Sequence, residues 1–291
     1  MPEQIFHEQT WSDELFIKFA HFIKANCGIN INLTKKDIIF GKIHKRMVAL
    51  KIKSAKSYWE YLQNEQTIND YQEIWNLFDL ITTKETFFQR YPEHFEILQT
   101  RVLPELIENE KKNITIWSSG CSTGEEPYDI AMSLLEYINE NKSYVTGSII
   151  ATDISDKVLE NAKIGQYPDR RIAKLSDKKS KKFFTETSPE KSPYPFAKRV
   201  LEINPDVKKW VTFSRHNLIQ DEFYQGIDII FCRNVFIYFD METQKQIFYK
   251  FFNSLNKGGY LFLGPMESLH VTETIFNAIK INNCTIYQKP L

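Results

Sequence analysis

Residues 11 to about 80 place apolar side chains at helical spacing. WSDELFIKFAHFIKANCG begins with Ser12 as a predicted N-cap and stops at Gly28. A second helical pattern follows Thr34, which we expect to cap it, and repeats apolar residues three and four positions apart. Two shorter helical segments come next, SAKSYWEYLQNE (54–65) and NDYQEIWNLFDLI (69–81). The pattern predicts a small N-terminal helical bundle.

After residue 113 the pattern changes to short apolar runs separated by helical stretches. Strands are predicted at ITIWSS, SIIATD, IDIIFCRN, YLFLG and NCTIYQK. Helices are predicted at EPYDIAMSLLEYINE, SDKVLENAKIG and METQKQIFYKFFNSLNKGG. This alternation is typical of an α/β fold with a doubly wound, mostly parallel sheet covered by helices on both faces.

Residues 170–208 interrupt the alternation with a stretch rich in Lys, Ser and Pro. Proline is excluded from central strands and helix interiors, and YPFAKRVLEI is the one strand candidate there. We interpret the stretch as a small inserted β-subdomain, with a long irregular connection as the alternative. The predicted domains are residues 1–79, a linker at 80–90 and an α/β domain at 91–291.

Composition and charge limit the class of protein. Lys+Arg and Asp+Glu both number 37, so the net charge of zero gives no global case for nucleic-acid binding. We expect neither a signal peptide nor direct membrane insertion, because the N-terminus lacks a basic and apolar leader and no apolar run reaches about 18 residues. The four cysteines form no CxxC pair, which disfavours structural zinc and disulfides and favours a cytoplasmic protein.

The motif WSSGCSTGEEP lies between the first predicted strand and its helix. Three residues separate Gly120 from Gly124, whereas a phosphate-binding Walker loop has four and then Lys-Ser/Thr. Glu125 and Glu126 follow, where a phosphate loop needs positive potential, so a pyrophosphate would be repelled. They also suit a helix N-terminus, which leaves a purely structural role as the alternative.

A cationic nucleoside without phosphates fits this loop better, and S-adenosylmethionine is such a ligand. Gly120 and Gly124 let the backbone approach it closely. Asp153 ends the second predicted strand, where doubly wound folds bind ribose hydroxyls. Together these residues predict a nucleoside site.

Several longer stretches resemble one known family along nearly the whole chain. They are ITTKETFFQRYPEHFEIL, IWSSGCSTGEEPYDIAM, ATDISDKVLENAKIGQY, VTFSRHNL, IDIIFCRNVFIYFD and GGYLFLGPMESL. The sequence resembles the chemotaxis receptor glutamate O-methyltransferases (CheR type). The resemblance implies S-adenosylmethionine-dependent methylation of glutamate carboxylates in cytoplasmic chemoreceptor domains, with S-adenosylhomocysteine as product. It also implies that residues 1–79 dock on the receptor and residues 80–90 cover the cofactor.

The resemblance implies site residues position by position. Arg90 would orient the substrate carboxylate, and Tyr238 would shape the methyl-transfer site. Each has a structural alternative: a surface ion pair for Arg90, a buried tyrosine for Tyr238 and a core position for Phe88. The implied cofactor contacts are Lys84, Thr86, Phe88, Arg90, Gly120, Glu126, Asp153, Asn217, Leu218, Cys232, Arg233 and Asn234. No metal is expected.

Two departures from the family pattern keep other functions open. Lys84 stands where the family usually has Asn, and Pro265-Met266 replace His-Ser. One alternative is a weakened member that binds cofactor or receptor, and another is a methyltransferase of this fold with a different substrate. CRNVFIYF stands where many nucleobase methyltransferases carry Asn-Pro-Pro-Tyr, which disfavours base methylation.

Basic residues dominate the stretch from Lys35 to Lys56, where eight face the single acid Asp37. The alternatives are a solvated helix face and a nucleic-acid site, and the latter is disfavoured because aromatic residues are not interleaved. The resemblance implies docking on acidic chemoreceptor helices. The candidates for this contact are Lys42, Lys45, Arg46 and Lys53. The inserted subdomain grips a C-terminal receptor peptide in some family members, and the sequence leaves that open here.

Overall fold

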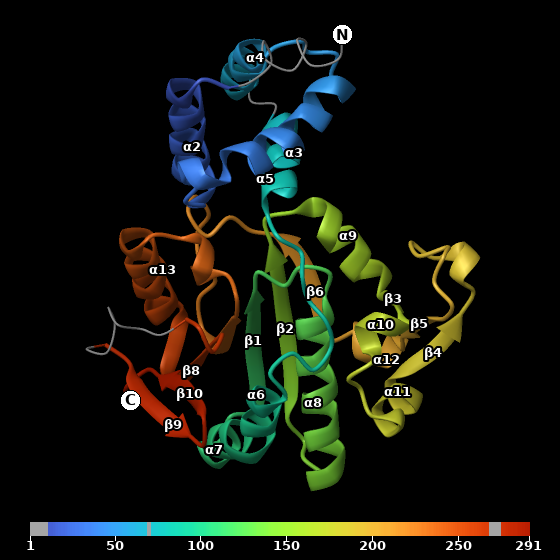
Figure 1. The fold of residues 1–291 in the computed structure, drawn as a ribbon. Helices are drawn as coiled ribbons and strands as arrows, with labels where there is room; N and C mark the ends of the chain where they lie inside the picture. The colour runs from blue at the N-terminus through green and yellow to red at the C-terminus, as the bar shows by residue number, and fades with distance from the viewer. Residues whose placement is uncertain (1–10, 69–70, 268–274) are drawn as a thin grey trace. The chain divides into compact units, whose positions relative to one another are not determined.

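Figure 1 shows the computed structural model, which describes residues 11–68, 71–267 and 275–291. The chain forms two compact units. The first unit comprises Met1–Thr83 with two short later segments, Asn217–Asp221 and Tyr238–Asp240. The second unit comprises Lys84–His216, Glu222–Ile237 and Met241–Leu291.

The first unit is helical, as its apolar spacing predicts. The Oγ of Ser12 accepts the Leu15 N–H at 3.1 Å, and Gly28 closes the first helix at φ 76°, so both predicted ends are confirmed. Phe16, Phe19 and other apolar side chains of this helix are buried. The helices are α2 (Asp13–Cys27), α3 (Lys36–Ala49), α4 (Ala55–Ile68) and α5 (Gln72–Ile81). The first two residues of the predicted 69–81 helix lie outside the described residues.

The predicted cap of the second helix is wrong. Thr34 lies inside a 3-10 turn, Leu33–Lys35, and its hydroxyl donates to Asn32 Oδ1 at 2.5 Å. α3 begins at Lys36, so its N-cap position falls on Lys35, which makes no side-chain cap, and Thr34 lies one residue too early to serve. The predicted helix itself is confirmed.

The second unit contains a seven-stranded sheet with the order β6-β2-β1-β7-β8-β10-β9. The first five strands pair in parallel, and β10 and β9 add antiparallel at one edge. This arrangement confirms the predicted mostly parallel sheet, although β6 and β9 were not predicted. The strands are β1 (Asn113–Ser119), β2 (Thr146–Asp153), β6 (Val211–Arg215), β7 (Ile227–Cys232), β8 (Leu255–Leu263), β9 (Asn277–Ile281) and β10 (Cys284–Gln288).

Helices connect the parallel strands and pack on the sheet (Figure 1). α8 (Glu125–Asn141) follows β1, α9 (Asp156–Ile164) follows β2, and α13 (Met241–Ser254) precedes β8. α6 (Pro92–Ile97), a π-helical turn (Leu98–Val102) and α7 (Leu103–Glu108) lead into β1.

The helix predicted over METQKQIFYKFFNSLNKGG is too long at its C-terminal end. α13 stops at Ser254, and β8 already includes Gly258 and Gly259. A Cβ on Gly259 would lie 2.9 Å from the Asn256 carbonyl oxygen and 3.0 Å from that of Asp228. The glycine therefore allows a close backbone approach within the sheet and does not end the helix.

The stretch around residues 170–208 contains a small antiparallel sheet with the order β3-β5-β4. The interpretation as a folded subdomain is confirmed, and only the last four residues of YPFAKRVLEI form its strand β5. Its elements are β3 (Gln166–Pro168), α10 (Asp169–Ile172), α11 (Asp177–Phe183), β4 (Phe184–Thr187), β5 (Val200–Ile203) and α12 (Pro205–Lys208).

The core of the second unit fixes the carboxyl ends of the central strands. Every residue of β7 is buried, and the rings of Phe231 and Phe262 stack with centroids 4.3 Å apart. Trp117 Nε1 donates to Thr152 Oγ1 at 2.8 Å, which ties β1 to β2 close to their ends. The loops that follow β1, β2 and β7 therefore start from one rigid edge.

Candidate active site

The loop from β1 to α8 is built on two left-handed glycines. Gly120 has φ 78° and Gly124 has φ 92°, a region that favours glycine. A Cβ on Gly120 would lie 2.4 Å from Val235 Cγ2, so this position excludes any side chain. The N–H groups of Gly120 and Cys121 donate to the Thr152 carbonyl at 2.8 and 2.9 Å. The loop is therefore held against the end of β2.

Asp153, the last residue of β2, turns its carboxylate to this loop. Its Oδ2 accepts the Ser122 N–H at 2.9 Å, and its Oδ1 accepts the Ser155 N–H at 3.0 Å. Burial raises the pKa of Asp153, while these donors and the nearby charge of Lys84 act to lower it. Each carboxylate oxygen has acceptor capacity beyond one bond, so this group can also accept from a pair of hydroxyls.

Glu125, the first residue of α8, is fully buried. It accepts the Thr123 hydroxyl at 2.7 Å and Arg171 Nη1 at 3.0 Å. Burial raises the pKa of Glu125, and the charge of Arg171 opposes that rise. Arg171, which lies on α10, also donates from Nη1 to the Thr86 carbonyl. One arginine of the inserted subdomain thus joins the start of α8 to the segment that precedes the sheet.

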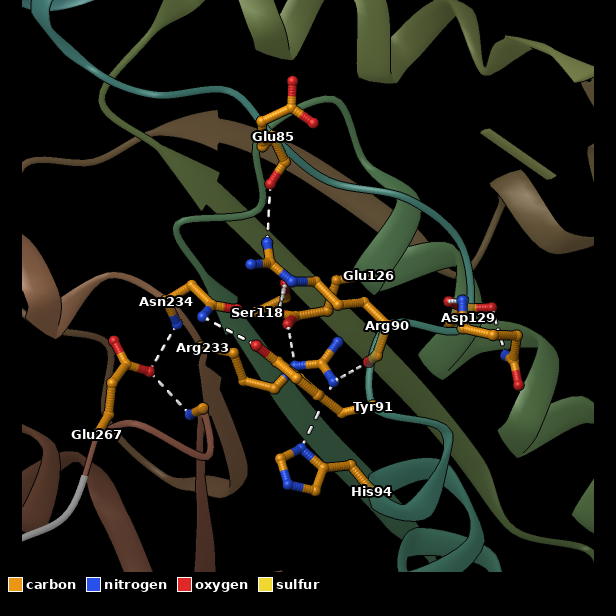
Figure 2. A network of polar contacts seen from close by, with 12 residues as sticks. Glu85, Arg90, Tyr91, His94, Ser118, Glu126, Asp129, Arg233, Asn234 and Glu267 are labelled. Carbon is orange, nitrogen blue, oxygen red and sulfur yellow. Dashed lines mark hydrogen bonds and ion pairs between the residues drawn. The ribbon is translucent and has the colours of Figure 1, made fainter. Parts of the chain in front are cut away.

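Glu126 has a different arginine as its partner. Its Oε1 accepts the Ser118 hydroxyl and its Oε2 accepts Arg233 Nε, both at 2.6 Å. The Arg233 side chain is 3% exposed, and its Nη1 donates to the Arg90 carbonyl at 2.5 Å. Figure 2 shows Arg233 between Glu126 and the Arg90 backbone.

The surroundings of Arg233 are aromatic. Its guanidinium carbon lies 5.0 Å from the ring centroid of Phe95 and 5.7 Å from those of Tyr91 and Phe231. Burial and the charge of Arg233 lower the pKa of His94 to about 3. The imidazole is therefore neutral at physiological pH, and Arg233 is the cation that pairs with Glu126.

Residues 84–91 form an irregular segment with a turn near its end, before α6, which we call the 84–91 segment. Arg90 Nη1 donates to the Glu85 carbonyl at 2.8 Å, and its guanidinium lies 5.8 Å from the Phe87 ring and 5.5 Å from the Tyr91 ring. Gln89 and Tyr91, on either side of Arg90, have φ 57° and 60°. This short turn presents the Arg90 side chain within the polar network of Figure 2.

Glu267 holds the loops after β7 and β8 together. Its Oε2 accepts the N–H groups of Asn234 and Gly264 at 2.6 and 2.8 Å, and its Oε1 accepts that of Phe236 at 2.8 Å. Asn234 Nδ2 donates to the Tyr91 hydroxyl at 3.2 Å. Its Oδ1 is buried and accepts no hydrogen bond from any residue that the structure describes. An unused carbonyl oxygen therefore remains beside the 84–91 segment.

The four cysteines are all buried, and burial raises the pKa of each thiol. None of them has the low pKa of a nucleophilic thiolate. Within residues 11–68, 71–267 and 275–291, no group of three or more His, Cys, Asp or Glu side chains is arranged to hold a metal ion. The groups described at this edge of the sheet that could act on a ligand are therefore hydrogen-bond acceptors and arginine side chains.

Two family models match this chain. The model described as CheR methyltransferase, SAM binding domain, matches residues 84–285, and the CheR methyltransferase all-alpha domain matches residues 14–82. The chain belongs to the CheR methyltransferase family. It is an enzyme that uses S-adenosylmethionine, and the resemblance seen in the sequence is confirmed.

Relatives of similar length support this membership. The chemotaxis protein methyltransferase of Borreliella burgdorferi is 36% identical over 263 residues, covering 88% of each chain. The chemotaxis protein methyltransferase Cher2 of Pseudomonas putida is 31% identical over 94% of this chain and 97% of its own. A chemotaxis protein methyltransferase of Vibrio parahaemolyticus is 32% identical over 96% of this chain and 98% of its own.

The hydrogen-bond acceptors of this CheR methyltransferase fit the cofactor. Asp153 offers carboxylate oxygens suited to a ribose diol, and Asn234 Oδ1 is a buried acceptor suited to an ammonium group. At Gly120 a side chain would collide with Val235, so the backbone itself forms the wall of the loop. The two glutamates at the start of α8 are each paired with an arginine, Glu125 with Arg171 and Glu126 with Arg233, so the exclusion of phosphates that the sequence suggests stays a prediction.

The sequence-predicted residues divide between the two units. Asn217, Leu218 and Tyr238 group with the first unit, where Asn217 Nδ2 donates to the Asn26 carbonyl at 2.6 Å and the Tyr238 carbonyl accepts the Asn30 N–H at 2.8 Å. Their roles at the cofactor stay predictions. The second unit holds Lys84, Thr86, Phe88, Arg90, Gly120, Glu126, Asp153, Cys232, Arg233 and Asn234.

Phe88 and Cys232 have surroundings typical of a core. The Phe88 ring is fully buried and packs edge-on against Tyr167 and Phe184, with centroids 4.8 and 5.3 Å away. The Cys232 side chain is fully buried at the end of β7. These surroundings favour the core alternative for Phe88 and a backbone role for Cys232.

The predicted receptor-docking residues lie on and after α3. Lys45 and Lys53 are exposed, and Lys42 is half-buried. Arg46 Nε donates to both carboxylate oxygens of Glu73, at 2.8 and 2.7 Å. Since Glu73 is 2% exposed, the charge of Arg46 is directed to the interior of the first unit. Lys45 and Lys53 remain the candidates whose side chains are exposed.

Sequence reasoning missed Asp129, Arg171 and Glu267. Asp129 had a readable signal, because it is the one acid in the run Tyr128–Leu134 of α8, where every side chain is buried. Glu267 directly follows Pro265-Met266, where the sequence departs from the family pattern, so the motif carries no clear signal for it. Arg171 stands in a basic stretch whose residues look alike in the sequence, and only the tertiary structure selects it.

Proposed function

We propose that this methyltransferase transfers the methyl group of S-adenosylmethionine to glutamate side chains in the cytoplasmic domain of methyl-accepting chemoreceptors. The products are glutamyl methyl esters and S-adenosylhomocysteine, and the place of action is the cytoplasm. Family membership and the names of the relatives support the substrate class. The observation that carries the proposal is the acceptor set of Asp153 and Asn234 beside a loop whose backbone is exposed by Gly120.

The substrate group needs little acid–base help. A glutamate carboxylic acid has a reference pKa of about 4.3, so the substrate is already an anion at pH 7. S-Adenosylmethionine supplies an electrophilic methyl group, which passes to a carboxylate oxygen as its bond to sulfur breaks. The chain's own part is to orient and desolvate the carboxylate, which can lower a barrier by roughly 7–11 kcal/mol.

Named residues of the second unit would carry these tasks. Asp153 would hold the ribose hydroxyls, and Asn234 Oδ1 would accept from the ammonium group. Arg90 would pair with the substrate carboxylate, since its guanidinium has several donors and one bond to the Glu85 carbonyl. Glu126 and Arg233 would keep this edge of the sheet rigid through their buried ion pair.

The domain roles belong to the same proposal. Residues 1–79 would dock on the receptor through Lys45 and Lys53, residues 80–90 would cover the cofactor, and residues 91–291 would perform the reaction.

Neither departure from the family pattern favours an inactive protein. The charge of Lys84 acts on Asp153, and Glu267, next to Pro265-Met266, keeps its three backbone donors. The described part of the chain contains no helix long and apolar enough to cross a membrane.

A labelling experiment tests the proposal. The chain is incubated with methyl-labelled S-adenosylmethionine and receptor-containing membranes, and the labelled product is then treated with base. Glutamyl methyl esters release volatile methanol, whereas N-methyl groups are stable. A receptor with glutamine at every methylatable glutamate serves as the control and should take up no label. Base-stable label, or equal labelling of that control, would overturn the proposal.

A further inference from the structure

Arg90 lies between two residues with unusual backbone conformations. Gln89 has φ 57° and Tyr91 has φ 60°, although neither is glycine. Residues in this region are uncommon and persist only where surrounding contacts hold them. The contacts that hold this turn therefore decide where the Arg90 side chain is presented.

Asp129 makes the contacts on the N-terminal side of the turn. Its Oδ2 accepts the Gln89 N–H at 2.6 Å, and its Oδ1 accepts Gln89 Nε2 at 2.7 Å. Asp129 lies on α8 and is 1% exposed. Both carboxylate oxygens of Asp129 thus bind the same residue: one accepts the backbone N–H of Gln89, and the other accepts its side-chain amide.

Arg233 makes the contact on the C-terminal side of the turn, where its Nη1 donates to the Arg90 carbonyl at 2.5 Å. The backbone around Arg90 is therefore fixed at the preceding N–H by a buried side chain of α8 and at its own carbonyl by a buried side chain of the loop after β7. Figure 2 shows Asp129 on one side of the 84–91 segment and Arg233 on the other. The Arg90 guanidinium extends from this fixed turn to the Glu85 carbonyl.

A purely structural role explains Asp129 poorly. Its neighbours on α8, Tyr128 and Ile130, are buried, and no ion pair with Asp129 is found within the described residues. Burial of a carboxylate without an ion-pair partner is unfavourable, and it raises the pKa of Asp129 to about 7. An apolar side chain would fill this position on a buried helix at lower cost.

We infer that Asp129 is a positioning residue for the reaction: by clasping Gln89 it sets the strained turn that places the Arg90 guanidinium. The inference rests on the proposed function, in which Arg90 meets the substrate carboxylate. Asp129 itself has no part in binding substrate or cofactor. Its effect on turnover should therefore exist only while Arg90 is present.

A double-mutant cycle on the full chain tests this dependence. Asp129→Ala, Arg90→Ala and the double variant are compared by kcat and KM in the receptor-labelling assay, with thermal melting measured alongside. Asp129→Ala should lower kcat at least about tenfold, because misplacement of a group by an ångström costs up to about a hundredfold. In the Arg90→Ala background the same substitution should change kcat by less than about twofold, since the two residues act as one unit.

Two further variants separate positioning from folding. Asp129→Asn keeps the shape, and a flipped Gln89 amide can restore both hydrogen bonds, so kcat should stay within about threefold of wild type. Gln89→Ala removes one bond at a half-buried position and remains informative if Asp129→Ala does not fold. It should lower kcat about threefold in the wild-type background and leave kcat unchanged in the Arg90→Ala background.

The outcomes distinguish the positioning role of Asp129 from the proposed function. If Asp129→Ala or Gln89→Ala lowers kcat by the same factor in the Arg90→Ala background as in wild type, the positioning role is overturned and the proposed function stays intact. A lower melting temperature with unchanged kcat also overturns it. Wild-type turnover in Arg90→Ala would refute the role of Arg90, and the positioning role with it, while base-labile labelling would still support glutamate methylation.

Discussion

Arg233 and Glu126 form a 2.6 Å ion pair in which the arginine side chain is 3% exposed and the glutamate side chain 11% exposed. The same arginine bonds the Arg90 carbonyl, so the pair connects the start of α8 with the 84–91 segment. Two charges at this depth are stabilising only when their geometry is good and their other bonds are satisfied. Ser118 and the Arg90 carbonyl meet that condition here.

Arg233→Lys should therefore weaken cofactor binding although it keeps the charge. A lysine ammonium lacks the planar fork that bonds Glu126 and the Arg90 carbonyl together. We expect a loss of about 1–3 kcal/mol in cofactor binding, or roughly tenfold or more in Kd, measured by titration calorimetry. Arg199→Lys is the matched control, because Arg199 pairs with Glu186 at the surface of the inserted subdomain. Equal effects of the two substitutions would contradict this role.

Arg171→Ala should destabilise the second unit strongly. It removes the ion-pair partner of the fully buried Glu125 and one contact to the Thr86 carbonyl. Loss of one partner of a buried pair costs about 3–5 kcal/mol, which urea unfolding can measure. Glu125→Gln in the same chain should recover part of that loss, because no unpaired charge then remains. Arg170→Ala, at the exposed neighbouring position, should leave the free energy of unfolding within about 0.5 kcal/mol of wild type.

Local signals were sufficient for much of the fold. Ser12 and Gly28 delimit the first helix through local capping interactions, and β7 was predictable as a buried strand because all of its residues except Asp228 are apolar. β6 and β9 were missed because both are edge strands with several exposed side chains, so neither shows a continuous apolar run. The cap predicted at Thr34 is wrong because a 3-10 turn, Leu33–Lys35, precedes α3 and moves the N-cap position to Lys35.

The site divides in the same way. Glu126, Asp153 and Arg233 stand in motifs that the family resemblance identifies, but no motif states that Glu126 pairs with Arg233. Asp129 bonds a residue 40 positions earlier, and Arg171 bonds a carbonyl 85 positions away. Such partners are chosen by the tertiary fold, so sequence spacing does not reveal them.

Asp129 also predicts a pH dependence of stability. Burial raises its pKa from an ordinary value of 3.8 to about 7, against the opposing effects of Gln89, Lys179 and Arg233. A carboxyl whose folded-state pKa is raised stabilises the fold below its ordinary pKa, and that contribution is lost as the pH rises through about 7. Asp129→Asn is neutral at every pH, so its gain in unfolding free energy should grow between pH 4 and pH 7.

We expect a gain of about 1–3 kcal/mol at pH 8 that shrinks toward zero near pH 4, measured by thermal or urea unfolding over this range. Glu222→Gln, at an exposed position of the second unit, should show no such trend. A gain that is constant with pH, or that increases in acid, would contradict the raised pKa.

Asp153→Asn should weaken cofactor binding while the fold persists. The amide keeps one acceptor oxygen and places an NH₂ group against the N–H of Ser122 or Ser155, so at least one bond is lost. Hydrogen bonds to a charged group are worth about 1.5–3 kcal/mol, so the Kd for S-adenosylhomocysteine should rise about 10- to 100-fold. Asp156→Asn is the control, because Asp156 pairs with Arg215 at the surface of α9. An unchanged Kd in Asp153→Asn would remove Asp153 from the binding site.

Charge reversal at Lys45 and Lys53 tests receptor docking by the first unit. Both side chains are exposed, and surface charges act mainly on encounter, so Lys45→Glu/Lys53→Glu should raise the KM for receptor about tenfold or more and leave kcat nearly unchanged. At physiological ionic strength, salt screens the attraction between exposed charges that are more than about 8 Å apart. The KM for receptor should therefore increase with salt in the wild type and much less in the variant. Lys257→Glu, a reversal at an exposed position of the second unit, is the control. If it raises KM equally, the effect comes from net charge, and residues 1–79 lose their assigned role.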